Sequence, residues 1–593
     1  MRLPDQSRQF NLYSGTVATD QSRQFNLYSG TITTPYHIPL PMTRWQLGPG
    51  WLTPKLHALI KAEHWHWLVL LVWIVPLLLA GFFDLDHQSL MAHDEGLYAR
   101  RARVIVDSGD WIHPWATPHH KTPGPYWVVA LFIQLLGRHE VAVRLPSVLA
   151  SIGCLWLTYS IGRRLLNPTA ALLGALSLGV APLWLQYSRL ATPDVLFTGL
   201  ILLAIWLMLA AERQQSSSKH WCYLGAGITL GITVLIRSAL AAVPMACLLP
   251  YMLLSGKHHL RQWSLYLGGL IGLLPTATWL WLCWRRYDMA VIEAIVNFPV
   301  SQGLTTDRAK SPLFYLFNLL VNDFLWIFFA LAAVGLLSLR FLRTHTKVTY
   351  VCQPQISLLL LYPLLYLGLL SFASTKLPHY AIPTYPFLAL LTGYTMERLL
   401  TPSLSITIKR LLTTVNGLLV LLGTVLIAAG GLALVTDILP SADDIRPYAP
   451  IALGLGLGWL AAGMLWFRTS QNQPILLSWL VLLLLGHWLG LTIAWGTADL
   501  GNINPDMKAL LIRDDIQPVL QTEAVGFSPG LNSKRSTLLR FYTPNPGEKL
   551  DTLEAIGPND YIWIEDNELP TLTKPYDSLG KIERTHLIRI LAQ

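Results

Sequence analysis

Long apolar segments recur along the chain between about residues 66 and 496 and are separated by short clusters of charged residues. Most of these segments have about 17–25 residues, the length that a helix needs to cross a hydrocarbon core about 30 Å thick. Because a helix closes its own backbone hydrogen bonds, we expect helices and not strands. The pattern therefore predicts a polytopic α-helical membrane protein.

The predicted membrane helices number about thirteen by this length criterion. Their expected ranges are 65–83, 141–162, 169–187, 193–211, 221–236, 239–255, 264–284, 313–337, 356–374, 379–396, 412–435, 449–467 and 474–495. A long polar loop, 84–140, separates the first two, and its one apolar piece, Tyr126–Gly137, is too short to span. We expect that piece to form a helix lying at the membrane interface.

Lysine and arginine recur in alternate loops, for example at Arg163–Arg164, at Arg213 and Lys219, and at Lys257 and Arg261. The positive-inside rule then places the N-terminus in the cytoplasm and the loop 84–140 outside. An odd number of helices places the C-terminus outside as well. We expect a multi-pass protein of the cell inner (plasma) membrane, in contact with membrane lipids.

Three regions follow from these boundaries. Residues 1–64 are polar, contain a perfect 12-residue duplication (Asp5–Thr16 and Asp20–Thr31), and are expected to be a disordered cytoplasmic tail. Residues 65–496 form the transmembrane domain with its first periplasmic loop. Residues 497–593 lack long apolar runs, and strand-like segments at Asp560–Asp566 and Leu587–Leu591 predict a small extracytoplasmic α/β domain.

Composition narrows the function classes. The net charge of +9 could suggest nucleic acid, but the basic residues are spread over alternate loops and form no continuous face, so we expect no nucleic-acid partner. The five cysteines have no CxxC spacing, which argues against a disulfide framework or a zinc site. Neither a GxxxxGK[ST] motif nor a dinucleotide fingerprint occurs, which argues against nucleotide-driven transport and a redox cofactor.

The first outer loop carries the candidate chemistry. Asp94 and Glu95 lie close to the end of the first helix, where an uncompensated charge would cost about 3 kcal/mol. A structural alternative pairs these acids with nearby arginines of the same loop. Lys121 lies before Thr122-Pro123, and the proline stiffens the turn that follows the lysine.

Several motifs of this loop occur in a characteristic order. An acid pair is followed by a tyrosine (Asp94, Glu95, Tyr98), then by Ser108–Trp111 (SGDW) and Pro114, by Lys121, Pro123, Tyr126 and Trp127, and by Arg144–Ser147 (RLPS). Further along are Arg189–Asp194 (RLATPD) and Ser374, Lys376, Tyr380 and Pro383 within STKLPHYAIP. Together they resemble the bacterial GT-C glycosyltransferases related to protein O-mannosyltransferases, especially the aminoarabinose transferase of lipid A, over residues 65–593.

The chain departs from that family at two places. The family's lysine often follows a glutamate and directly precedes a proline, whereas His120 and Thr122 flank Lys121 here. A second family lysine, followed by Gly-Pro at a helix exit, is matched by Arg237-Ser238. Because histidine is a competent metal ligand, His120 is the candidate residue for a divalent metal; no other cofactor is expected.

The resemblance implies a GT-C fold and transfer of a sugar from a polyprenyl-phosphate-linked donor to an extracytoplasmic acceptor, which could be a lipid, a glycan or a protein. Because the lipid phosphate is already a good leaving group, the enzyme needs a base for the acceptor and cations for the phosphate. One carboxylate and a single displacement predict inversion at the anomeric carbon.

The candidate residues take the following roles. We expect Asp94 as the base, with Glu95 second, and Lys121, Arg237 and Lys376 on the phosphate. Tyr98 shares the loop motif, and Arg189 with Arg285 or Arg286 are weaker candidates for the phosphate. Asp194 is expected to pair with Arg189, and His379 and Tyr380 either line the acceptor side or cap a helix. An Asp-x-Asp pattern at Asp84–Asp86 is attributed to chance.

Other functions remain open at this point. A transporter or lipid flippase would also be polytopic, but it favours ionisable residues at mid-membrane and broken helices in paired halves. An O-antigen ligase or polymerase would share the cofactorless chemistry, but its large loop falls late in the chain. A non-catalytic scaffold gives no reason for the acidic and basic residues of the first loop.

Overall fold

The structure, a computed structural model, describes residues 63–79, 89–91, 94–115, 120–214, 217–304, 310–343, 353–400, 405–435, 445–468, 473–496 and 504–592. The predicted tail therefore lies almost wholly outside the described residues, as do Asp84–Asp86.

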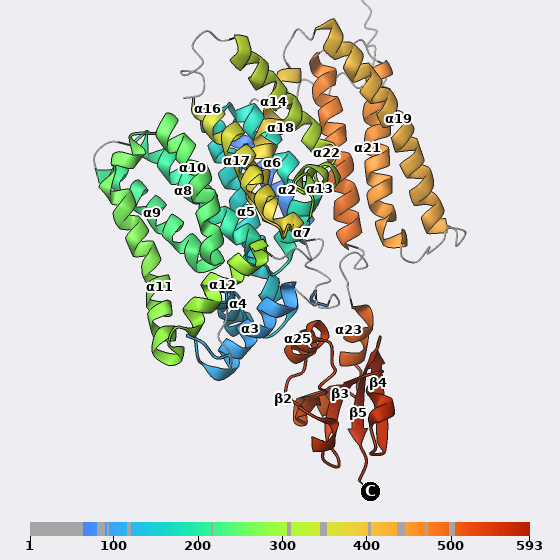
Figure 1. Ribbon diagram of the computed structural model, residues 1–593. Coiled ribbons are helices and arrows are strands. Elements are labelled where there is room, and N and C mark those ends of the chain that lie inside the picture. Colours follow the sequence, from blue (N-terminus) through green and yellow to red (C-terminus); the bar gives the residue numbers. More distant parts are fainter. Residues whose placement is uncertain are drawn as a thin grey trace, which may run out of the picture. The chain divides into compact units, whose positions relative to one another are not determined.

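The membrane part is a bundle of apolar helices (Figure 1). In chain order they are α2 (His66–Leu79), α5 (Glu140–Leu165), α6 (Pro168–Gly179), α7 (Pro182–Arg189), α8 (Pro193–Ala211), α9 (Ser217–Arg237), α10 (Ala242–Leu254), α11 (Trp263–Tyr287), α12 (Ala290–Leu304), α13 (Phe314–Asn322), α14 (Trp326–Arg343), α16 (Pro354–Ile356), α17 (Tyr362–Phe372), α18 (Tyr385–Leu399), α19 (Ile406–Val435), α21 (Ala449–Arg468) and α22 (Gln473–Gly496). Each of the thirteen expected ranges contains helix, which confirms the polytopic helical class.

The count of spans differs from the expected thirteen. Eight helical segments of the described chain are long and apolar enough to cross a membrane, or nine if the pair α6 and α7, bent by 65°, is one span. The difference arises because the ranges 221–236 and 239–255 form one helical segment, Ser217–Leu254, and because α18, Ser357–Phe372 and Glu63–Val75 are shorter than a span. Leu325, with a φ of 74°, also divides 313–337 into α13 and α14, of which α14 is long enough to span.

Two long helices approach each other closely through glycine. Gly227 and Gly231 of α9 face Gly268 and Gly272 of α11, and a Cβ atom at any of the four would collide with the opposite backbone. Small residues at a crossing let two backbones pack closely where lipid provides no hydrophobic driving force. The loop helices α3 (Asp94–Ser108) and α4 (Gly124–Leu136) lie between α2 and α5 in the chain, and α4 confirms the short helix expected near Tyr126–Gly137.

The C-terminal region carries a mixed five-stranded sheet (Figure 1). Its order is β2-β1-β3-β5-β4, with parallel pairs β2-β1 and β1-β3 and antiparallel pairs β3-β5 and β5-β4. The strands are β1 (Val525–Phe527), β2 (Pro546–Lys549), β3 (Tyr561–Glu565), β4 (Tyr576–Ile582) and β5 (Thr585–Ile590), with helices α23 (Pro505–Leu511), α24 (Gln517–Thr522) and α25 (Ser533–Tyr542). Strands β3 and β5 confirm the two predicted strands.

Candidate active site

Helix α3 begins at Asp94 and is anchored by the next residue. The Glu95 carboxylate accepts two hydrogen bonds from Arg144 of α5, at 2.6 Å from Nε and 2.8 Å from Nη2. It also accepts from the backbone N–H groups of Met91 (2.9 Å) and Ala191 (3.2 Å), and its side chain is fully buried. With this set of donors Glu95 is placed to position the start of α3 and not to act as a base, and the role of Asp94 as the base stays a prediction.

The SGDW segment forms a turn at the other end of α3. Gly109 has a φ of +68°, which favours glycine, and Asp110 accepts from the backbone N–H groups of Ile112 (2.9 Å) and His113 (3.2 Å). Asp110 also pairs with Arg286 of α11 at 2.5 Å. This motif therefore fixes the loop to α11 and engages Arg286, one of the weaker phosphate candidates.

Aromatic rings and cations gather beside α3. The Tyr98 and Tyr126 rings lie 5.3 Å apart, and the Lys121 ammonium lies 5.3 Å from the Tyr98 ring. The Arg101 guanidinium lies 4.9 Å from the ring of Trp115 and 5.7 Å from that of Tyr126. Cation–π attraction holds both cations against these rings, so two positive charges contact one aromatic cluster.

Arg101 was not among the residues expected to bind substrate. Burial lowers the pKa of its guanidinium, an effect that Tyr126 and Tyr98 oppose. Among the described residues its buried Nη1 has no hydrogen-bond partner. A buried, unsatisfied guanidinium donor is suited to an anion. Helical spacing could have indicated it, because Arg101 follows Tyr98 by three residues in α3 and both contact Tyr126.

Lys121 is held against the exit of α9. The backbone N–H of Thr122 donates to the Ser238 hydroxyl at 3.1 Å, and the two hydroxyls lie 3.0 Å apart. Gly124 packs so tightly on Leu235 and Ile236 that a Cβ atom would collide there. Ser238 adopts a φ of 49°, the left-handed conformation that glycine occupies easily, and thus takes over the turn for which the family uses Gly-Pro.

Arg237, the residue before that turn, forms an ion pair with Asp194 at the start of α8. The expectation that Asp194 pairs with Arg189 is therefore wrong. Arg189 instead lies at the end of α7, close enough to Glu95 and Arg144 for their charges to interact. The Arg237 guanidinium also lies 6.0 Å from the ring of Tyr380. Its positive charge is partly neutralised, which makes Lys121 and Arg101 the stronger anion-binding groups.

His379 lies near both Lys121 and Arg237. Burial, followed by the charges of Arg237 and Lys121, lowers its pKa to about 3. Its Nδ1 is 2.9 Å from the hydroxyl of Tyr187. At neutral pH it is therefore a neutral hydrogen-bonding group and not another cation.

Lys376 has a different environment from the one expected. Its ammonium is buried and donates to the backbone carbonyls of Ala373 (2.5 Å) and Lys310 (3.0 Å). These bonds close the connection before the short helix Pro378–Thr384. A role on the phosphate stays a prediction that this geometry does not favour.

His120 is half-buried among positive charges. Burial, Lys121 and Arg101 lower its pKa to about 4. The neutral imidazole is able to bind a metal, but the same two cations repel one, so the arrangement suits an anion better than a divalent ion. The metal at His120 stays a prediction.

The C-terminal region docks on α3. Arg103 is buried and donates through Nη1 to the carbonyls of Arg540, Phe541 and Thr543, at 2.5, 3.0 and 2.6 Å, and through Nη2 to that of Pro544 at 2.6 Å. These carbonyls end α25, where a cation is favoured by the helix dipole. The helix that carries Asp94 and Arg101 is therefore braced by the C-terminal region.

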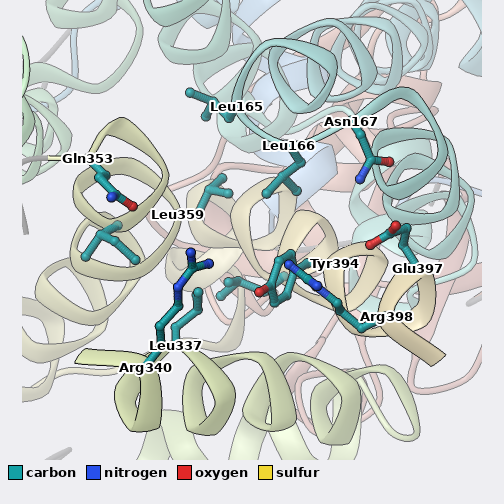
Figure 2. Close-up of a pocket in the computed structure, with 12 residues that line it drawn as sticks. Leu165, Leu166, Asn167, Leu337, Arg340, Gln353, Leu359, Tyr394, Glu397 and Arg398 are labelled. Atoms are coloured by element: carbon teal, nitrogen blue, oxygen red, sulfur yellow. The ribbon is translucent and has the colours of Figure 1, made fainter. Parts of the chain in front are cut away.

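Two cavities lie away from the cations beside α3. One of about 580 Å³ opens between the end of α5 and helices α14 and α18 and is lined by Asn167, Arg340, Glu397 and Arg398 together with leucines (Figure 2). Another, of about 650 Å³, lies in the C-terminal region around Arg535 and Glu583. The first lies at the end of α5 opposite to Arg144, so it is separate from the cations beside α3.

The chain resembles known proteins in sequence and in fold. Residues 120–282 match the family model of dolichyl-phosphate-mannose-protein mannosyltransferases. An undecaprenyl phosphate-α-4-amino-4-deoxy-L-arabinose arabinosyl transferase of Pseudomonas paraeruginosa is 29% identical over 440 residues, 70% of this chain and 75% of the relative. That of Pseudomonas aeruginosa is 28% identical over 442 residues, with the same coverage.

Among solved structures, ArnT from Cupriavidus metallidurans bound to undecaprenyl phosphate matches with a TM-score of 0.69 and 20% identity, over 88% of this chain and 98% of that one. The fold and the sequence similarities define this chain as a membrane glycosyltransferase of the GT-C class. The chain is similar to the dolichyl-phosphate-mannose-protein mannosyltransferases over residues 120–282 and to the aminoarabinose transferases over 70% of its length.

Proposed function

We propose that the chain transfers a sugar from a polyprenyl-phosphate donor to an acceptor on the outer side of the inner membrane. The observation that carries the proposal is the placement of two cations against the Tyr98–Tyr126 ring pair: Arg101 on the helix that begins at Asp94, and Lys121 from the loop before α4. Two cations there suit a departing lipid phosphate. The match to the arabinosyl transferases supports the same class of donor.

The proposed reaction is a single displacement. The acceptor hydroxyl attacks the anomeric carbon, its proton passes to Asp94, and the bond between that carbon and the phosphate oxygen breaks. Lys121 and Arg101 stabilise the negative charge that grows on the phosphate, and polyprenyl phosphate leaves. A positioned base contributes about 10²–10⁴-fold. The product's anomeric configuration should be inverted, and retention in its NMR spectrum would contradict the single step.

In this proposal the N-terminus lies in the cytoplasm, and residues 84–140 and 497–593 lie outside, as the distribution of Lys and Arg predicts. The acceptor is a lipid, a glycan or a protein. The C-terminal region, braced on α3 through Arg103, covers the outer side of the site. Cysteine labelling from one side of sealed vesicles tests the orientation: a cysteine introduced at the exposed Lys534 should react from outside.

The transferase is tested against the transporter with purified protein in detergent and a panel of radiolabelled polyprenyl-phosphate sugars. We expect at least one donor to lose its label to an acceptor extract or to water. The same donors in sealed vesicles should show no movement of intact donor that depends on the protein. Intact donor that crosses the bilayer without turnover would favour the flippase.

A further inference from the structure

We propose that Glu212, His258 and His259 form a binding site for a divalent transition metal, Zn²⁺ being the best fit, at the end of α8 remote from Asp194. The three side chains come from two loops, one directly after α8 and one between α10 and α11. Their ligand atoms all lie within 4.8 Å of one another. This site is independent of the proposed transferase chemistry.

The distances match a tetrahedral centre. Glu212 Oε1 lies 3.3 Å from His258 Nε2 and 3.2 Å from His259 Nε2. Ligand atoms that are 2.0–2.1 Å from a tetrahedral zinc ion lie about 3.3–3.4 Å apart. The Tyr251 hydroxyl lies 3.2 Å from Glu212 Oε1 but only 2.8 Å from His259 Nε2, closer than two ligands of one zinc ion, so a water and not the phenol is the expected fourth ligand.

Groups around the proposed metal site orient the imidazole of His259, the buried member of the three. His259 is fully buried, and its second nitrogen, Nδ1, lies 2.8 Å from the hydroxyl of Tyr223 on α9. With Nε2 on a metal, Nδ1 carries the proton and donates to this oxygen, the arrangement that fixes the tautomer of metal-binding histidines. A Cβ atom at Gly256 would collide with the His259 ring, so the glycine leaves room for the imidazole.

The ligand types fit a transition metal better than calcium or magnesium. Two imidazoles and one carboxylate are a usual set for zinc, whereas the harder cations prefer oxygen alone. His258 and Glu212 are partly exposed, which gives the ion a route from solvent, and His259 closes the inner side.

The position of the site suggests a structural role. Helix α8 has 19 residues, so about 28 Å separate Asp194 near its start from Glu212 just beyond its end. A bound ion would tie α8 to the α10–α11 loop, with Tyr223 of α9 and Tyr251 of α10 around it. It would clamp one end of the α8–α9 pair, whose other end carries the Asp194–Arg237 ion pair.

The test uses the full-length, tag-free protein in detergent, stripped with EDTA and titrated with Zn²⁺ by calorimetry. Metal content is measured after dialysis. We expect one tight equivalent, together with a rise in Tm. His258→Ala and Glu212→Gln, at partly exposed positions, should each weaken binding at least tenfold, and the double variant should abolish this equivalent.

The matched control is His220→Ala, a histidine of α9 near Ser264 that lies outside the cluster. It should bind Zn²⁺ like the wild type. His120→Ala separates this site from the one beside Lys121 and should also leave the tight equivalent intact. The proposal is overturned if the wild type binds no tight equivalent, if the double variant retains it, or if His120→Ala alone removes it.

Discussion

The carboxylate of Glu95 and the guanidinium of Arg144 form a two-pronged ion pair, at 2.6 and 2.8 Å, in the interior of the protein. This pair joins the first turn of α3 to α5, one residue after Asp94. Both side chains are almost fully buried, so water cannot take the place of a partner that is removed. The pair therefore fixes the backbone at the position of the proposed base.

Removal of Glu95 from the pair with Arg144 should strongly lower the stability of the protein. Breaking a buried ion pair from one side typically costs about 3–5 kcal/mol, because the remaining charge is buried and uncompensated. We expect Glu95→Ala to lower Tm strongly and to reduce transfer, as measured by size-exclusion after heating and by the radiolabel assay. Arg138→Ala, which removes the exposed pair with Asp107, should change the stability by no more than about 1 kcal/mol. Equal effects of the two variants would contradict this role.

The sequence predicts much of this fold because a helix needs a set number of apolar residues to cross the membrane. Helices α5, α8, α11 and α21 lie within a few residues of their expected ranges. The breaks are harder to predict. Leu325, for example, has a positive φ that no local signal of a leucine indicates, so one expected span became α13 and α14.

The candidate site was predicted as a region but not as a set of contacts. The motif order placed Asp94 and Lys121 in one loop, and their roles stay predictions, whereas the partner of Asp194 depends on how α9 packs beside α8. Arg237 and Asp194 are 43 residues apart, and local sequence favoured Arg189. Arg101 was missed because its burial arises from Trp115 and Tyr126, which meet it only in the folded loop.

Ser238 links the end of α9 to the loop that carries Lys121. Two substitutions separate the effect of its backbone conformation on stability from the effect of its hydroxyl group. Ser238→Ala keeps a side chain at a φ of 49° and loses the bond from Thr122 N–H, worth about 0.5–1.5 kcal/mol. Ser238→Gly loses the same bond but relieves a left-handed conformation that costs about 1–2 kcal/mol. Ser238→Gly should therefore be the more stable and more active variant, measured by Tm and by the KM for the donor. The reverse order would contradict the strained turn.

Arg101 should strengthen the binding of polyprenyl phosphate while lowering the thermal stability of the protein. Its buried guanidinium has an unsatisfied donor among the described groups, so Arg101→Met should leave Tm unchanged or raise it. The same variant should weaken the binding of polyprenyl phosphate by about tenfold or more, equivalent to about 1.4 kcal/mol. Calorimetric titration and thermal unfolding measure the two effects. Arg589→Met, which removes an exposed cation near Tyr561 of the C-terminal sheet, should change neither. Unaltered affinity in Arg101→Met would remove this residue from the site.

Arg103 should hold the C-terminal region in place. Arg103→Met leaves four carbonyls at the end of α25 without their donor. We expect faster release of a C-terminal fragment in limited proteolysis, and lower transfer while donor binding persists. The isosteric exposed control is Arg513→Met, whose side chain bonds only locally to Asp515. Unchanged proteolysis would contradict the bracing role.

The central claim is that the helix starting at Asp94, with Lys121 beside it, performs the transfer. The most direct measurement is a single-turnover assay of sugar transfer from a radiolabelled polyprenyl-phosphate donor by wild type, Asp94→Asn and Lys121→Ala, alongside donor binding. The account predicts that Asp94→Asn binds the donor normally but transfers at least 100-fold more slowly, in line with a base worth about 10²–10⁴-fold. Lys121→Ala should lose both binding and rate. Transfer by folded Asp94→Asn at the wild-type rate would contradict the account.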